Sequence, residues 1–324
     1  MEEQEAGILS GSFFRELTVV FLVFSLAAFA PFVGIVALVF LPFPIFYYYS
    51  KHNRAWGLAL SGLSISIFCL ILLIIDLRET AAVFVTLTFL GVMMAEVVKR
   101  NISIEKTVFY IVAATFVLGI VFVLYQSFQF REAPWHMIGA YIEKKVHQSI
   151  SLYEYMGISS EQINIVKENK AGIVAFITKI FPAICLVGMI LTVWLNLLEG
   201  KIIFPKHGLP YPDFGNLNSW KAPEKMVWFL IAAGIILLLP EERTKILGWN
   251  VLIVILFIYL LAGVAIVDFI LKKIGIYKGI RYVILFLVFA QQFISLVVIA
   301  VGIFDLWVDF RKLNRPINGA DAVK

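Results

Sequence analysis

Polar side chains inside apolar segments are the residues of this sequence whose types and places could support chemistry. Gln291 and Gln292 lie near the middle of the last apolar segment, and Ser295 follows one turn later. Inside a membrane such groups must find partners away from water. The two amides could contact a solute, or they could form hydrogen bonds with neighbouring helices, worth about 0.6 to 2 kcal/mol each.

Two further polar residues have a similar setting. Lys179 lies one or two turns inside the apolar stretch 171–198, where its ammonium group could meet an anion or snorkel to the membrane surface. Asn250 opens another apolar segment. If these side chains line one cavity, they form a binding site. The predicted substrate-binding residues are therefore Gln291, Gln292, Lys179 and Asn250.

Acidic residues near the ends of two apolar segments favour a structural role. Asp268 has Lys272 four residues later, the spacing of an ion pair on one helix face. Asp305 and Asp309 share one face at the end of the last segment, and Lys312 is within reach of Asp309. We interpret both as boundary features.

The sequence offers no catalytic, metal or cofactor site, so we expect that the protein is not an enzyme. Its histidines lie in loops or at segment ends, whereas an intramembrane metalloprotease or a haem protein needs them at membrane depth. They are His52, His136, His147 and His207. Glu241-Glu242-Arg243 lacks the arginine spacing of an intramembrane protease signature, because position 246 is Ile. Cys69 and Cys185 sit in apolar runs without metal-ligand spacing.

Composition assigns the chain to the α-helical membrane proteins. Hydrophobic residues make up 61% of the sequence and charged residues 15%, and the mean hydropathy is +0.92. A soluble domain carries about 25% charged residues. Continuous apolar runs, without alternation, argue against a β-barrel. The net charge of +5 is typical of cytoplasmic loops that meet a lipid bilayer, and we expect no nucleic-acid partner.

Apolar stretches of about 20 residues predict an all-α bundle of eight or nine spans in one integral membrane domain, residues 1–324. The first stretch, Leu17 to Tyr49, either divides by a tight turn at Pro31 into helices 14–30 and 32–49 or forms one kinked helix. Its end, the aromatic run 46–49 before a basic loop, is typical of a membrane interface. The other predicted spans are about 55–75, 80–97, 105–128, 171–198, 224–240, 249–271 and 280–308.

Two longer connections separate these spans. Within 130–170, Ile138, Ile142, Val146 and Ile150 recur at helical spacing opposite a polar face, which predicts an amphipathic surface helix after the fifth span. Ser159 with Gln162 resembles a capping box for the next helix. The second connection, 199–223, is rich in Pro and Gly.

Small residues and loop charges complete the pattern. Ala55, Ala59, Gly62 and Ser66 share one face of the third span, where they would let helices approach closely within the protein or against a partner subunit. Lys and Arg concentrate in alternate loops, which we expect to be cytoplasmic. This alternation leaves the basic tail with Arg315 on the opposite side, against the rule.

Several segments together resemble one family. They are Pro42-Phe-Pro44, Gly91 followed by Glu96 and Arg100-Asn-Ile-Ser103, Trp220-Lys-Ala-Pro223, Asn250 with Leu261-Ala-Gly263-Val-Ala-Ile266, and Gly302-Ile-Phe-Asp305 with Asp309-Phe-Arg311-Lys312. The pattern resembles the YybS-like bacterial membrane proteins, domain of unknown function 2232. In character it is also similar to the S-components of energy-coupling-factor vitamin transporters, although extra spans and the 130–170 insertion depart from those six-helix subunits.

These observations lead to two hypotheses. The first is a multi-pass protein of the bacterial inner membrane that binds or helps to transport an unidentified small molecule, with a partner membrane subunit. The alternative is a scaffold or assembly protein of the cell envelope, suggested by the 130–170 helix. A membrane enzyme ranks third, because paired intramembrane carboxylates and deep histidines are missing from the sequence.

Overall fold

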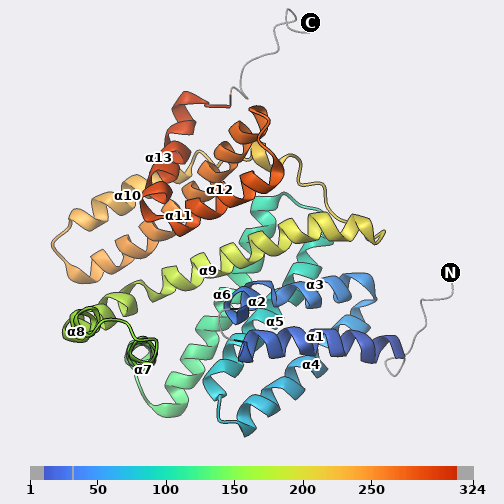
Figure 1. Ribbon diagram of the computed structural model, residues 1–324, viewed down its shortest axis with the longest axis horizontal. Helices are drawn as coiled ribbons and strands as arrows, with labels where there is room; N and C mark the ends of the chain where they lie inside the picture. Colours follow the sequence, from blue (N-terminus) through green and yellow to red (C-terminus); the bar gives the residue numbers. More distant parts are fainter. Residues whose placement is uncertain (1–10, 31–32, 312–324) are drawn as a thin grey trace, which may run out of the picture. The chain divides into compact units, whose positions relative to one another are not determined.

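The computed structural model describes residues 11–30 and 33–311, and every regular element in this part of the chain is a helix (Figure 1). The predicted all-α class is confirmed. The chain divides into two compact units, residues 1–141 with 188–213 and residues 142–187 with 214–324, and each is described by itself. The single membrane domain stays a prediction.

The first unit holds the N-terminal helices and the end of α9. Its elements are α1 (Gly11–Phe29), α2 (Val33–Phe40), α3 (Pro42–Lys51), α4 (Arg54–Ile74), α5 (Arg78–Val98), α6 (Ile104–Phe130), the start of α7 (Pro134–Tyr155) and the C-terminal part of α9 (Lys170–Lys206). The second unit holds the remainder of α7 and α9 with α8 (Ser160–Glu168), the 3-10 helix η2 (Leu217–Ser219), α10 (Met226–Leu238), α11 (Glu242–Lys273), α12 (Lys278–Ala290) and α13 (Gln292–Val308).

Three phenylalanines form the centre of the first unit. Phe24 of α1, Phe68 of α4 and Phe84 of α5 are fully buried. Their ring centroids lie 5.3 Å (Phe24 to Phe68), 5.5 Å (Phe24 to Phe84) and 4.8 Å (Phe68 to Phe84) apart. Each buried ring of this kind stabilises the fold by about 1.5 to 3 kcal/mol. The cluster thereby holds α1 against the α4–α5 hairpin.

The first apolar stretch forms three helices where the sequence predicts two. Pro42 and Pro44 have no N–H to donate, so each would remove a hydrogen bond from a continuous helix, but both suit the first turn of a new helix. The chain accordingly ends α2 at Phe40 and begins α3 at Pro42. The predicted turn at Pro31 lies outside the described residues.

Within residues 11–30 and 33–311, six helices are long and apolar enough to cross a membrane: α1, α4, α5, α6, α9 and α11. A seventh span results if α12 and α13, which meet at a bend of 100°, count as one. The predicted eight or nine spans are not confirmed. The reason is length, since α2, α3 and α10 have 8, 10 and 13 residues, and a span needs about 20.

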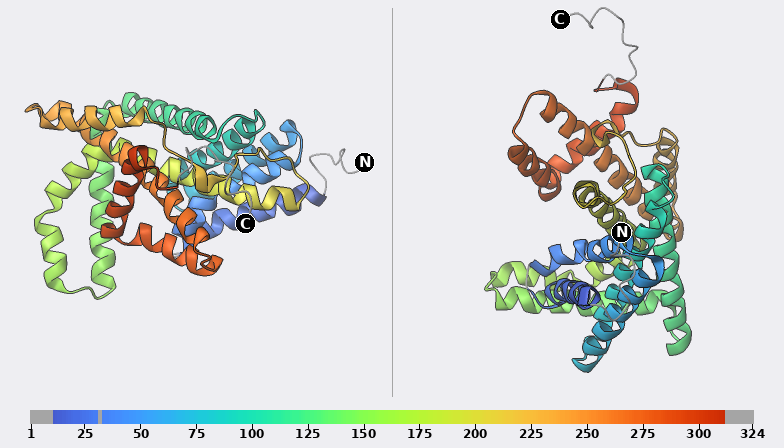
Figure 2. Two further views of the ribbon diagram at one scale, coloured as in Figure 1. Left: turned by 90° about the horizontal axis from the view of Figure 1, so that it is seen from above. Right: turned by 90° about the vertical axis from the view of Figure 1, so that its right-hand side faces the viewer.

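The 130–170 region contains two helices, α7 and α8. Ser159 accepts a hydrogen bond from the backbone N–H of Gln162 (3.4 Å) and so caps α8, as the capping pattern predicts. In the second unit, Glu143 pairs with Lys170 (2.8 Å), and this hydrogen bond lowers the pKa of Glu143. The two helices form the arms of a hairpin in the left view of Figure 2. Their predicted place on the membrane surface is not confirmed.

The predicted small-residue face of the third span is exposed. On α4, Gly62 and Ser66 face outward, and a Cβ added to Gly62 would meet nothing within 4 Å. The buried face of α4 instead carries Gly57, Ser61 and Ser64. The side chains of the two serines donate to the helix backbone one turn earlier (2.7 and 2.6 Å). The small residues that allow close packing of α4 are therefore Gly57, Ser61 and Ser64, on the face next to the predicted one.

Glycines bring α11 and α13 into backbone contact in the second unit. A Cβ on Gly263 would overlap the carbonyl oxygen of Val298, and one on Gly302 would overlap that of Tyr259. The two overlaps lie four residues apart on both helices and run in opposite directions along them. The helices therefore cross antiparallel, with hydrogen atoms in place of side chains at the contact.

We expect Gly263→Leu or Gly302→Leu to destabilise the protein by about 1 to 3 kcal/mol or more, because the added side chain must push the two backbones apart. Thermal unfolding of the purified protein in detergent measures this effect. Gly234→Leu is the matched control, since a Cβ at Gly234 meets nothing within 4 Å. Equal melting temperatures for all three variants would contradict the close crossing.

Candidate functional site

An open cavity of about 380 Å³ lies in the first unit, where α1, α3 and the end of α9 meet. Charged and aromatic side chains form most of its wall. The lining residues are Arg15, Glu16, Phe43, Tyr47, Tyr48, Lys51, Ile203 and His207.

A buried carboxylate organises the charges at this cavity. Glu16 is only 1% exposed, and it accepts hydrogen bonds from Lys51 Nζ (2.9 Å) and from His52 Nε2 (3.1 Å). Such pairing is needed because leaving a buried charge without its partner costs about 3 to 5 kcal/mol. Arg15 has no ion-pair partner among the described residues. The wall therefore has two cations against one anion, and its net charge is positive.

Aromatic rings give the same cavity apolar faces. Tyr47 stacks on Phe43 with a centroid distance of 6.3 Å and meets the His207 ring edge-on at 5.5 Å. Burial, together with the charge of Glu16, raises the pKa of Tyr48. The phenol of Tyr48 therefore keeps its proton and can donate a hydrogen bond. Cations, a hydroxyl donor and ring faces together suit an organic anion.

Sequence reasoning missed this cavity, because its residues come from three distant parts of the chain. Arg15, Lys51 and His207 share no motif spacing, and only the fold brings them together. One signal was present in the aromatic run 46–49 that precedes Lys51. The sequence predicts an interface belt there, which stays a prediction, and two of its rings, Tyr47 and Tyr48, line the cavity.

The predicted residue Asn250 lies against α9 in the second unit, where its amide bonds to the backbone beside Pro182. Pro182 has no N–H, and a proline in a helix also disturbs the next hydrogen bond, which would join Ala183 to Lys179. Asn250 Oδ1 accepts from the N–H of Ala183 (2.8 Å), and its Nδ2 donates to the carbonyl of Lys179 (2.8 Å). A second Nδ2 bond reaches the carbonyl of Ile246 (2.8 Å), so both amide hydrogens are used.

The four predicted binding residues fall into two places. Lys179 lies beside Asn250, and its ammonium group is 3.6 Å from a carboxylate oxygen of Glu242. Gln291 and Gln292 are exposed at the break between α12 and α13, where Ser295 donates to the carbonyl of Gln291 (3.1 Å). The position near mid-span that the sequence indicates is thus a helix boundary. Solute binding by these four residues stays a prediction.

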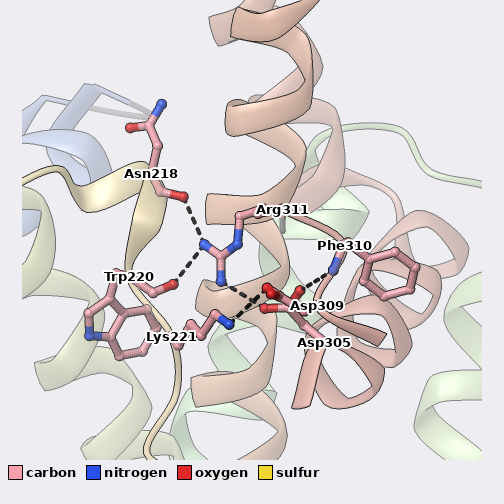
Figure 3. Close-up of polar contacts among 7 residues, drawn as sticks. All are labelled: Asn218, Trp220, Lys221, Asp305, Asp309, Phe310 and Arg311. Atoms are coloured by element: carbon pink, nitrogen blue, oxygen red, sulfur yellow. Dashed lines mark hydrogen bonds and ion pairs between the residues drawn. The ribbon is translucent and has the colours of Figure 1, made fainter. Parts of the chain in front are cut away.

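A charged cluster closes the end of the second unit (Figure 3). The Arg311 guanidinium is buried, and it donates to Asp305 (2.8 Å) and to the carbonyl oxygens of Asn218 (2.7 Å) and Trp220 (2.9 Å). Beside it, Lys221 pairs with Asp309 at 2.9 Å. The cluster ties the connection before α10 to the end of α13.

Asp268 joins the same connection to α11 and α12. It pairs with Arg281 (2.5 Å) and accepts from the side chain of Asn218 (2.5 Å), so Arg281 takes the place that the sequence predicts for Lys272. Lys312, the predicted neighbour of Asp309, lies outside the described residues. Because these groups are engaged with one another, the arrangement is suited to holding the fold.

A family model described as "Predicted membrane protein (DUF2232)" matches residues 17–306. The chain belongs to this family. The match includes the cavity residues of α3 and α9 and the glycine crossing of α11 and α13. It confirms the predicted membrane class and the contact with lipid that follows from it. No curated protein and no solved structure matches the chain.

We expect Asn250→Ala to destabilise the protein by about 1 to 3 kcal/mol, because it leaves the Ala183 N–H and the Lys179 carbonyl without partners. A double-mutant cycle with Pro182→Ala, followed by thermal unfolding, isolates the cause. In the Pro182→Ala background the helix can form its own hydrogen bonds, and the cost of Asn250→Ala should fall. An equal cost in both backgrounds would show that Asn250 acts in another way.

We expect Arg311→Ala to destabilise the protein by about 3 to 5 kcal/mol, since it leaves the carboxylate of Asp305 buried without its cation. Asp305→Ala combined with Arg311→Ala should recover part of that loss, because neither charge then remains. Arg243→Ala serves as the control, as that side chain is exposed. If the double variant is as unstable as the sum of the single ones, the ion pair is not the cause.

Proposed function

We propose that this membrane protein binds a small organic anion in the cavity of the first unit, as a solute-binding or transport subunit of the bacterial inner membrane. The observation that carries the proposal is the combination of Arg15, Lys51 and His207 with aromatic faces around one cavity. Its volume of about 380 Å³ lies within the usual range for small-molecule sites, about 300 to 1,000 Å³. The proposed activity is binding, without a chemical reaction.

The buried Glu16 supports an anion as the ligand. It fixes Lys51 from within, so the ammonium group is held at the cavity wall before any ligand arrives. Arg15 remains available for a charge-assisted hydrogen bond, which contributes about 1.5 to 3 kcal/mol. As part of the same proposal, the protein resembles the vitamin-binding S-components and works with a partner membrane subunit.

A second candidate is a scaffold of the cell envelope. It is favoured by the α7–α8 hairpin, whose tip exposes Leu152, Tyr155 and Met156 at 53%, 90% and 52%. A cluster of exposed apolar side chains of this kind is suited to contact with a lipid surface or a protein partner. The predicted surface helix belongs to this candidate.

The test is ligand binding by purified protein in detergent, with a panel of aromatic carboxylates, aliphatic carboxylates and phosphate esters. Thermal shift finds the ligand class, and isothermal titration calorimetry measures its affinity. Arg15→Gln should weaken binding about tenfold or more, as expected for the loss of one charge-assisted hydrogen bond. Arg78→Gln is the matched control, because that exposed arginine lies away from the cavity wall.

The sequence-based site gives the opposing outcome. If Gln291→Ala with Gln292→Ala abolishes binding and Arg15→Gln leaves it unchanged, the ligand occupies the predicted site in the second unit. If no anion of the panel shifts the melting temperature, the proposal fails. A stable envelope complex that persists in all these variants would then support the scaffold.

A further inference from the structure

Two buried oxygen atoms on α9 have no hydrogen-bond donor among the described residues. They are Oδ1 of Asn196 and Oε2 of Glu199, both in the first unit. The orientation of Asn196 is fixed by its other end, because Nδ2 donates to the carbonyls of Val39 (2.8 Å) and Thr192 (2.7 Å). The residue is 0% exposed. An unpaired buried acceptor destabilises the fold, because it has lost its hydrogen bonds to water without gaining others.

Asn196 and Glu199 are three residues apart on α9, a spacing that places two residues on the same side of a helix. Residues three apart on a helix have Cβ atoms about 5 to 6 Å from each other. Both unpaired atoms are acceptors while Glu199 is ionised, so neither can satisfy the other. A proton on the Glu199 carboxyl converts one acceptor into a donor, and a single O–H···O hydrogen bond then satisfies both atoms.

A metal ion is a poorer occupant of this position. In the part of the chain that the structure describes, His, Cys, Asp and Glu form no group of three or more that could hold one. Hard cations take about six or more oxygen ligands, and only two oxygens here are unpaired.

The titratable groups of α3 and of the segment after α9 have other partners or lie at the cavity. Tyr211 donates its hydroxyl to the carbonyl of Leu197 (2.6 Å). On α3, Tyr49 bonds to Glu96, Lys51 pairs with Glu16, Tyr48 lines the cavity and Tyr47 packs on His207. Among the described residues, no cation lies within hydrogen-bond distance of the buried Oε2 atom of Glu199.

We propose that Glu199 and Asn196 form a proton-binding site, in which Glu199 holds a proton at neutral pH and donates it to Asn196 Oδ1. The proton comes from water, and the carboxylate becomes a carboxylic acid without loss of any other group. Glu199, Ile203 and His207 follow one another at intervals of four residues, so the site continues the cavity face of α9. It does not depend on anion binding there.

The first experiment follows thermal unfolding of the full chain between acidic and alkaline pH. The folded state holds a proton that the unfolded state releases, so the melting temperature should fall as pH rises. Glu199→Gln should remove this part of the pH dependence, because its amide donates to Asn196 at every pH. Glu224→Gln is the matched control, an exposed glutamate on a loop. Identical pH profiles for wild type and Glu199→Gln would overturn the proposal.

Infrared spectroscopy of the wild-type protein gives a second and independent test. A carboxylic acid C=O band should be present at neutral pH, shift in D₂O and be absent from Glu199→Gln. Lack of this band in the wild type overturns the proposal even if the variant does not fold. Stabilisation by sodium chloride over choline chloride that is lost in Glu199→Gln would instead assign the site to a cation.

Discussion

Backbone N–H and C=O groups in an apolar environment must be paired within the protein, because lipid cannot replace water as a partner. Prolines disturb this backbone pairing at two places in the protein. At Pro182 the amide of Asn250 takes up the carbonyl and the N–H that the helix cannot join. Near Pro42, where α2 gives way to α3, Asn196 donates to the carbonyl of Val39. Each asparagine thus supplies a hydrogen-bond partner to the backbone beside a proline.

The helix break before α3 also shapes the cavity. Because the chain starts a new helix at Pro42, α3 packs mainly against α5 and α4, whereas α2 packs against α1. Glu16, buried in α1, then fixes Lys51 and His52 at the end of α3 by hydrogen bonds. Local backbone chemistry thus determines where positive charge and aromatic surface come together.

The sequence predicts the class of this fold well, because composition and the length of apolar runs report directly on a bilayer. It predicts the span count less well. The segments on both sides of Gln291 are apolar, so the sequence predicts one span there, but the helix ends at Ala290. A hydropathy pattern does not record the bend of 100° between α12 and α13. Partners across the fold are likewise hidden: Asp268 has Lys272 at ideal spacing but pairs with Arg281, which follows a turn and approaches from the next helix.

Polar residues in apolar segments differ in whether all of their hydrogen-bonding groups have partners. Both amide hydrogens and the oxygen of Asn250 bond to backbone groups, so its presence in an apolar segment is explained without a ligand. Arg311 keeps one unpaired N–H, yet its charge is neutralised by Asp305. Asn196 and Glu199 differ, since each keeps a buried acceptor that no described residue satisfies. A proton on Glu199 is the smallest partner from outside the chain that would let these two acceptors bond to each other.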